Sequence, residues 1–233
     1  MSSIDGGEGP VSQKNAGAEA LLDIVIAYEL IYPQTVNVFS ADDTYYATED
    51  PNAYGFMDTT LDALDGSFCT YSAFGQKGDN NTIDPVYPDP HSGGYKGPLE
   101  CGTYTPPNVL SVSYTEGEQY LPVNYVERQC NEWMKLGLQG TTTLFASGDY
   151  GVAFYAGGYN TSTGCLKAPD GSPTVFAPSV WNGCPYILSV GATTIKPNVS
   201  GTAGGQPEEA VYAQFEGYAL PLSCRMSCAW TSY

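Results

Sequence analysis

The chain has 233 residues, of which 42% are hydrophobic and 14% charged, a composition typical of a globular protein with one sizeable core. Its net charge is −17, because 8 Lys and Arg stand against 25 Asp and Glu. Such a surface repels a phosphate backbone and an anionic bilayer, so we expect neither nucleic acid nor membrane as a partner. The acidic balance suits a protein that works in acid, although a plain acidic surface accounts for it equally well.

Several features favour an extracellular protein. N-glycosylation sequons begin at Asn80, Asn160 and Asn198. The seven cysteines lack C-x-x-C spacing and the chain has one histidine, so disulfides are favoured over a zinc site. Seven is odd, which leaves one cysteine unpaired or the chain incomplete. The first residues have neither the basic nor the apolar part of a signal peptide, so we expect that residue 1 is not the true start.

The first half of the chain predicts little regular structure. Leucine, valine and isoleucine recur at helical spacing after Asn15, a candidate N-cap, and Pro33 ends that run. A long irregular region in a compact domain is usually functional or cross-linked. In chain order we expect a loop at 1–14, a helix at Ala16–Leu30, a strand at Thr35–Phe39, an acidic loop at 41–50, a weak helix at Asn52–Leu64 and an irregular region at 65–107 held by Cys69 and Cys101.

The second half predicts a strand–helix–strand unit. Val109–Tyr114 and Thr141–Ala146 read as buried strands, and a helix runs from Pro122 to Gly140 between them. This order is typical of a right-handed crossover in a parallel sheet, and a further strand is expected at Pro185–Ala192. The fold class is therefore α/β with a mostly parallel sheet, whose chemistry lies beyond the carboxyl ends of the strands.

Two carboxylates on the first predicted helix form the best candidate pair. Glu19 and Asp23 are four residues apart, which places them on one helix face with Cβ atoms roughly 5–6 Å apart. Two close carboxylates favour sharing a proton, and such a pair can accept a proton from a nucleophile in acid. A solvated helix face is the plain alternative. The apolar surroundings and the absence of a nearby Lys or Arg in the sequence weigh against it.

Two further residues are candidates for chemistry. Asp149 lies in Ser-Gly-Asp-x-Gly after a predicted strand, where a protonated carboxyl can donate to a developing oxyanion. Its plain alternative is a turn-capping aspartate. His91 is the only histidine, so a Ser-His-Asp triad would have to use it. It lies in Pro-Asp-Pro-His-Ser-Gly-Gly, which favours a surface-loop histidine.

Five stretches together resemble the sedolisin, or serine-carboxyl peptidase, family, especially its fungal secreted tripeptidyl-peptidases. Their order and spacing also match, and the resemblance covers roughly residues 2–212. The stretches are Ala18–Ile24, Asn108–Tyr114, Arg128–Gly140, Leu144–Asp149 and Cys184–Thr193.

The resemblance implies a subtilisin-like α/β fold with flanking helices, incomplete in this chain. It implies that Glu19 is the general base for a serine, that Asp23 orients that base and that Asp149 stabilises the oxyanion. The strand at Ser111–Tyr114 corresponds to the one along which the substrate backbone lies. Disulfides Cys69–Cys101 and Cys165–Cys184 are guesses, because sequence alone does not fix connectivity.

The chain departs from the family pattern at several places. Thr115 and Tyr150 stand where the family usually has glycine and a small residue. The family's nucleophile lies in a Gly-Thr-Ser motif that this chain lacks, and Ser200–Ala203 lies too early and has alanine in place of that serine. Residues 213–233 are unlike the family. We therefore expect a partial catalytic domain at 1–212 and a divergent tail that reflects a frameshift, a retained intron or a gene-model error.

Three functions remain open from the sequence. The first is an acid peptidase, tripeptidyl by resemblance, whose serine is missing from this chain. The second is an inactive fragment or pseudoenzyme that at most binds peptides. The third is a glycosidase, which the i,i+4 spacing of the carboxylates disfavours. The resemblance implies a secreted monomer with peptide substrates, an inhibitory prodomain and a calcium ion whose ligands lie outside this chain.

Overall fold

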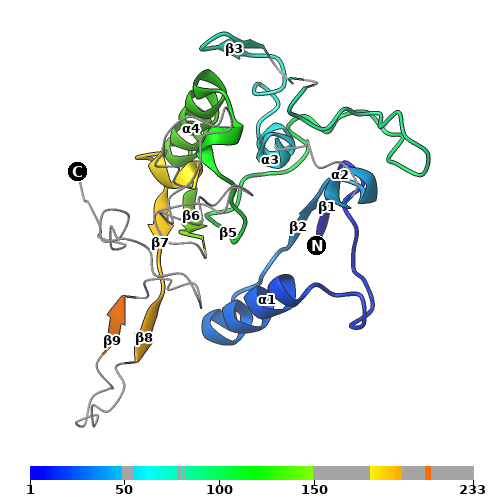
Figure 1. The fold of residues 1–233 in the computed structure, drawn as a ribbon. Coiled ribbons are helices and arrows are strands. Elements are labelled where there is room, and N and C mark those ends of the chain that lie inside the picture. The colour runs from blue at the N-terminus through cyan, green and yellow to red at the C-terminus, as the bar shows by residue number, and fades with distance from the viewer. Residues whose placement is uncertain (49–54, 78–79, 81, 149–178, 196–207, 211–233) are drawn as a thin grey trace, which may run out of the picture. The chain divides into compact units, whose positions relative to one another are not determined.

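The computed structural model describes residues 1–48, 55–77, 80, 82–148, 179–195 and 208–210 (Figure 1). It is a mixed α/β structure with parallel strand pairing, which confirms the predicted class at that level. The chain divides into two compact units, the first formed by residues 1–108 and 123–141 and the second by residues 109–122 and 142–233. None of the helices in the described ranges has the length and apolar character needed to cross a membrane.

The first unit contains most of the helices. Its first two strands pair in parallel, with Ser2 opposite Phe39 and Ile4 opposite Ala41. Helix α3 contacts both of these strands and also α4. The elements are β1 (Ser2–Ile4), α1 (Ala18–Ile31), β2 (Phe39–Ala41), α2 (Thr44–Thr48), α3 (Phe56–Leu64), β3 (Ser72–Ala73), β4 (Gln76–Lys77) and α4 (Val123–Leu138).

Helix α4 packs on α3 through side chains that are largely polar. Arg128 is buried and its Nη1 lies 3.3 Å from Asp58 Oδ1, while Nη2 donates to the carbonyl of Phe68. The guanidinium also stacks 3.6 Å from the centre of the Phe68 ring. Gln129 follows Arg128 on α4, and its Nε2 donates to Tyr125 Oη at 3.0 Å. Tyr125 in turn donates to Asp84. A buried charge is tolerated here because it is both paired and hydrogen-bonded.

The irregular region after α3 is cross-linked, as its length predicts. Cys69 and Cys101 form a disulfide with Cα atoms 6.1 Å apart, which confirms the first guessed pair. The backbone N–H of Gly102 then donates to Asp62 O at 2.7 Å, so the end of the region is fastened to α3. Cys184 is also disulfide-bonded, but Cys165 lies outside the described residues and the second guessed pair stays a prediction.

The second unit holds a parallel three-stranded sheet in the order β5 (Val109–Val112), β6 (Thr142–Ala146), β7 (Leu188–Val190). All three strands lie within the predicted ranges, with α4 between β5 and β6 in the chain, while the handedness of the crossover stays a prediction. The Phe145 ring stacks on Trp181 with centroids 5.4 Å apart. Two 3-10 helices, Glu118–Tyr120 and Trp181–Gly183, and an antiparallel pair, β8 (Thr193–Ile195) and β9 (Glu208–Ala210), complete the unit.

Several expectations for the first unit are wrong in part. The strand expected at Thr35–Phe39 lies at Phe39–Ala41 instead. The predicted loop at 1–14 contains β1, because Ser2–Ile4 gains a parallel partner from residues far along the chain. The predicted acidic loop at 41–50 contains α2, because Asp43 Oδ1 accepts the backbone N–H groups of Tyr45 at 3.0 Å and Tyr46 at 3.3 Å. Asp43 therefore acts as the N-cap of α2, and this cap stabilises a short helix in an acidic segment.

A hairpin in the predicted irregular region also departs from expectation. Strands β3 and β4 pair in antiparallel fashion, with Ala73 opposite Gln76. The two residues between them, Phe74 and Gly75, have φ of 54° and 83°. Positive φ at both central residues is the requirement of a type I′ turn, the form that matches the twist of a tight hairpin.

Replacing Arg128 with methionine is expected to destabilise the first unit by about 3–5 kcal/mol, because Asp58 is then left buried without its cation. Urea unfolding measures the change. The double variant Arg128→Met/Asp58→Asn is the matched control, since it removes the stranded charge and recovers part of the loss. Equal stabilities of the single and double variants contradict this account.

Candidate catalytic carboxylates

Glu19 and Asp23 lie on α1, as the sequence predicts, and both side chains are exposed. Helix α1 begins at Ala18, so Glu19 falls in its first turn, where the helix dipole favours a negative charge. The four-residue spacing places Asp23 one turn further along the same face. The helix therefore presents two acidic groups side by side to solvent.

Apart from Glu29, the rest of α1 is apolar and exposed or half-exposed. The helix has no buried residue, and its large apolar side chains remain exposed, among them Leu22 at 57% and Leu30 at 79%. A helix that is apolar on all sides is normally enclosed by other elements. The candidate acid pair therefore lies on a helix whose exposed apolar side chains are unusual for a protein surface.

Asp149 lies outside the described residues, but the strand end that leads to it is well fixed. Ser147 N donates to Val190 O at 2.9 Å, and its own carbonyl accepts from Ser179 Oγ at 3.2 Å. Asn182 Nδ2 donates to the carbonyl of Ala146 at 3.2 Å. Three hydrogen bonds from the second half of the unit thus hold the carboxyl end of β6.

Gly148 occupies a position that suits only glycine. Its φ is +83°, and a Cβ placed there would lie 3.0 Å from Ser179 Oγ and 3.2 Å from Thr115 Cγ2. The glycine of the Ser-Gly-Asp motif is therefore required by both the turn and the close neighbours. Thr115, a departure from the family pattern, is one of the groups that crowd this turn.

Glu116 is a buried carboxyl that sequence reasoning missed. Burial raises the pKa of Glu116 to about 8, so its side chain holds a proton in acid and at neutral pH. Its carbonyl accepts the N–H of Val180 at 3.0 Å, which joins the segment after β5 to the segment that carries Ser179. Nothing in Thr-Glu-Gly-Glu distinguishes buried Glu116 from exposed Glu118, so the sequence offers no signal for it.

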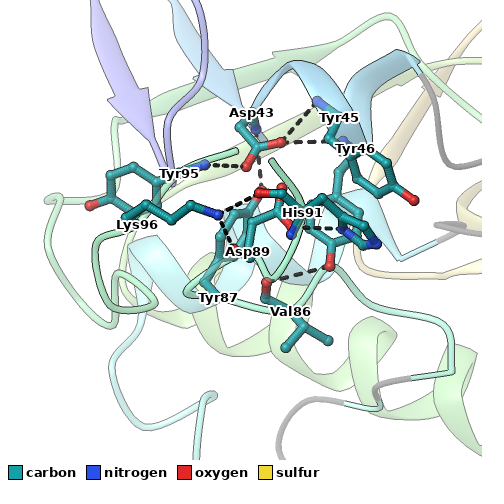
Figure 2. A network of polar contacts seen from close by, with 9 residues as sticks. All are labelled: Asp43, Tyr45, Tyr46, Val86, Tyr87, Asp89, His91, Tyr95 and Lys96. Carbon is teal, nitrogen blue, oxygen red and sulfur yellow. Dashed lines mark hydrogen bonds and ion pairs between the residues drawn. The ribbon is translucent and has the colours of Figure 1, made fainter. Parts of the chain in front are cut away.

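His91 belongs to a structural cluster in the first unit (Figure 2). Its Nδ1 lies 2.7 Å from Oδ1 of the buried Asp89, and its ring stacks on Tyr45 with centroids 3.7 Å apart. Lys96 Nζ donates to the carbonyls of Asp89 and His91, and Asp43 Oδ2 accepts the N–H of Tyr95 at 2.7 Å. The loop histidine predicted to lie at the surface is thus half-exposed but fastened to α2.

The described ranges contain no group of three or more His, Cys, Asp or Glu side chains arranged to hold a metal ion.

Asp42 is a second acid whose pKa is shifted. Burial raises its pKa to about 6, with a smaller contribution from the Asp43 charge, against hydrogen bonds from Thr59 and Tyr87 that lower it. Protonated carboxyls are therefore a feature of both units.

Comparison with known proteins identifies the relatives of this chain. Aorsin of Aspergillus oryzae is 50% identical over 209 residues, 90% of this chain and 30% of aorsin. The tripeptidyl-peptidase sed1 of Aspergillus fumigatus is 47% identical over 193 residues, 83% of this chain and 28% of that protein. The tripeptidyl-peptidase SED1 of Arthroderma otae is 35% identical over 207 residues. No protein-family model matches the chain.

The chain belongs to the sedolisin family, as the resemblance indicates. It spans less than a third of the length of the curated relatives named above. The structure brings Glu19 and Asp23 together on α1, and the position of Asp149 relative to them lies outside what it describes. The catalytic roles of all three residues stay predictions.

Replacing Ser179 with alanine is expected to loosen the end of β6, because the Ser147 carbonyl loses its side-chain donor. The loss is about 1 kcal/mol, so the amides of residues 145–148 exchange their hydrogens several times faster. Hydrogen-exchange mass spectrometry measures this, with Ser111→Ala, an exposed serine on β5, as the control. Unchanged exchange in Ser179→Ala, or an equal gain in the control, contradicts the assignment.

Proposed function

We propose that this chain is part of a serine-carboxyl peptidase that hydrolyses peptide bonds in acid, with tripeptidyl-peptidase action as the specific activity. The observation that carries the proposal is the 50% identity to aorsin across 90% of the chain. The names of two of the relatives, which describe tripeptidyl-peptidases, support the specific activity.

The proposed chemistry divides among three carboxyl groups. Glu19 accepts the proton of a serine hydroxyl as that oxygen attacks the substrate carbonyl, and Asp23 orients Glu19 and shares the proton. Asp149, protonated in acid, donates to the oxyanion that forms on the carbonyl oxygen. A carboxylate base suits this task at low pH, where an imidazole is already charged.

The serine is the missing part of this scheme. The chain contains no Gly-Thr-Ser sequence, so the attacking hydroxyl belongs to residues outside the 233. A base without a nucleophile does not start acyl transfer. The exposed apolar surface of α1 supports the alternative that this polypeptide, as it stands, is an inactive fragment or pseudoenzyme.

The remaining family properties are part of the same proposal. They include the subtilisin-like arrangement of the sheet, a partial catalytic domain at 1–212 with a divergent tail at 213–233, and secretion as an N-glycosylated monomer. A calcium ion, a peptide or protein substrate and an inhibitory prodomain complete the expected set.

The 233-residue chain is expected to release no tripeptides from an unblocked peptide at about pH 4, a range set by carboxylate titration. A chimera that replaces residues 213–233 with the part of aorsin that follows the matched region supplies a serine motif and is expected to be active. Glu19→Ala in the chimera should lower kcat by about a thousandfold, the scale of a lost general base.

Glu29→Ala is the matched control for that experiment, because Glu29 is also exposed on α1 but lies more than two turns from Glu19. It should leave turnover unchanged. A Glu19→Ala chimera with full activity sinks the assignment of the base. Turnover by the unmodified chain that Glu19→Ala abolishes overturns the claim that the chain itself is inert.

A further inference from the structure

A row of apolar side chains on α1 borders the candidate acid pair. Leu22, Ile26 and Leu30 recur every four residues, so they lie in one line along the helix surface. Leu22 follows Glu19 by three residues. Ile26 follows Asp23 by the same spacing. Residues three apart are neighbours on a helix, so the row lies directly beside both carboxylates. We call Leu22, Ile26 and Leu30 the α1 stripe.

The α1 stripe is more exposed than the other large apolar side chains of the helix. Leu22, Ile26 and Leu30 are 57%, 51% and 79% exposed. The others range from 38% for Ile24 to 48% for Tyr28. Leucine and isoleucine side chains stabilise a fold only when burial takes them out of water. Three of them in line therefore mark a surface that another segment covers.

The distribution of apolar side chains favours a covering within one molecule over a contact between two copies. Apolar residues occur on every side of α1, and the helix has no buried residue. An association of two copies through the α1 stripe would cover one side of the helix and leave its other apolar sides in water. A helix that is apolar all round is instead typical of the interior of a larger fold.

The relatives have enough further chain to cover α1. The matched region is 30% of aorsin and 28% of the tripeptidyl-peptidase sed1, so most of the length of both proteins lies outside it. The proposed serine belongs to that further chain, because the 233 residues contain no Gly-Thr-Ser sequence.

The position of Glu19 selects the part of the further chain that covers the stripe. For Glu19 to take the proton of the serine hydroxyl, the two oxygens have to come within about 2.6–3.2 Å of each other. The segment that carries the serine then lies against the surface of α1 next to Glu19. Leu22, less than one turn along the helix, is the apolar side chain that this segment meets first.

We propose that the α1 stripe is the docking surface for the segment that carries the serine in the complete peptidase. The occupant is an apolar stretch of the same polypeptide, and its contact with the stripe positions the serine hydroxyl opposite Glu19. Docking also excludes water from this side of the acid pair. The inference rests on the proposed function, which assigns Glu19 as the base, but its test does not require activity.

Photocrosslinking in the aorsin chimera of the activity experiment identifies the occupant. The photoreactive amino acid p-benzoylphenylalanine in place of Ile26 attacks C–H bonds of the segment that lies against the stripe. Mass spectrometry of the digested protein then identifies the linked peptide. The expected product joins residue 26 to the peptide with the Gly-Thr-Ser motif. A link to any other peptide of the chimera, or to a second copy of it, overturns the proposal.

Hydrogen-exchange mass spectrometry tests the same contact without an unnatural residue. In the 233-residue chain the amides of residues 18–31 should exchange with little protection, because α1 has no buried residue. In the chimera the same amides should exchange at least about tenfold more slowly, since burial of the stripe stabilises the helix. Equal exchange in the two proteins contradicts docking at α1.

Leu22→Gln in the chimera should remove most of the gained protection. It should also lower kcat by about tenfold or more with little change in KM, because the serine is no longer held against Glu19. Leu138→Gln is the matched control, since Leu138 is 82% exposed at the end of α4 and away from the stripe. Equal losses in the two variants overturn the proposal.

The docking and the peptidase function fail in different ways. An inactive chimera whose α1 is protected and crosslinked to the serine peptide contradicts the function and supports the docking. An active chimera whose residues 18–31 remain unprotected supports the function and contradicts the docking.

Discussion

The first unit depends on one buried cation. Arg128 is 2% exposed, and its guanidinium meets a carboxylate of α3, a carbonyl of the following turn and an aromatic face at once. These contacts offset the cost of burying the charge, which is several kcal/mol for an unpaired ion. The position of α4, the turn at Phe68 and the entry to the disulfide-closed loop are therefore all set relative to this side chain.

The predictable part of the fold is the part that rests on local pattern. The strands β5 and β6 and helix α4 follow from apolar runs separated by Pro122 and Gly140, and all three are confirmed. Strand β1 was missed because Ser2–Ile4 carries no strand pattern and gains its structure from β2, more than thirty residues away. Helix α2 was missed because its cap, Asp43, reads in sequence as one more acidic loop residue.

In the candidate site, too, the sequence predicts the features that depend on local spacing and misses those that depend on tertiary burial. The spacing of Glu19 and Asp23 fixes their common helix face without knowledge of the fold, whereas the positive φ of Gly148 was seen only in the structure. Tertiary burial was beyond sequence reasoning. Burial in the folded chain raises the pKa of Glu116 to about 8, while Glu118, two residues away, remains exposed.

The disulfide between Cys69 and Cys101 has a consequence for how the chain matures. It closes a loop that contains Asp84, Asp89 and His91. With a sequence separation of 32, the bond lowers the entropy of the open chain by an amount worth about 4 kcal/mol. In a reducing environment the disulfide does not form and this stabilisation is absent. Folding of the acid-rich loop therefore depends on oxidising conditions.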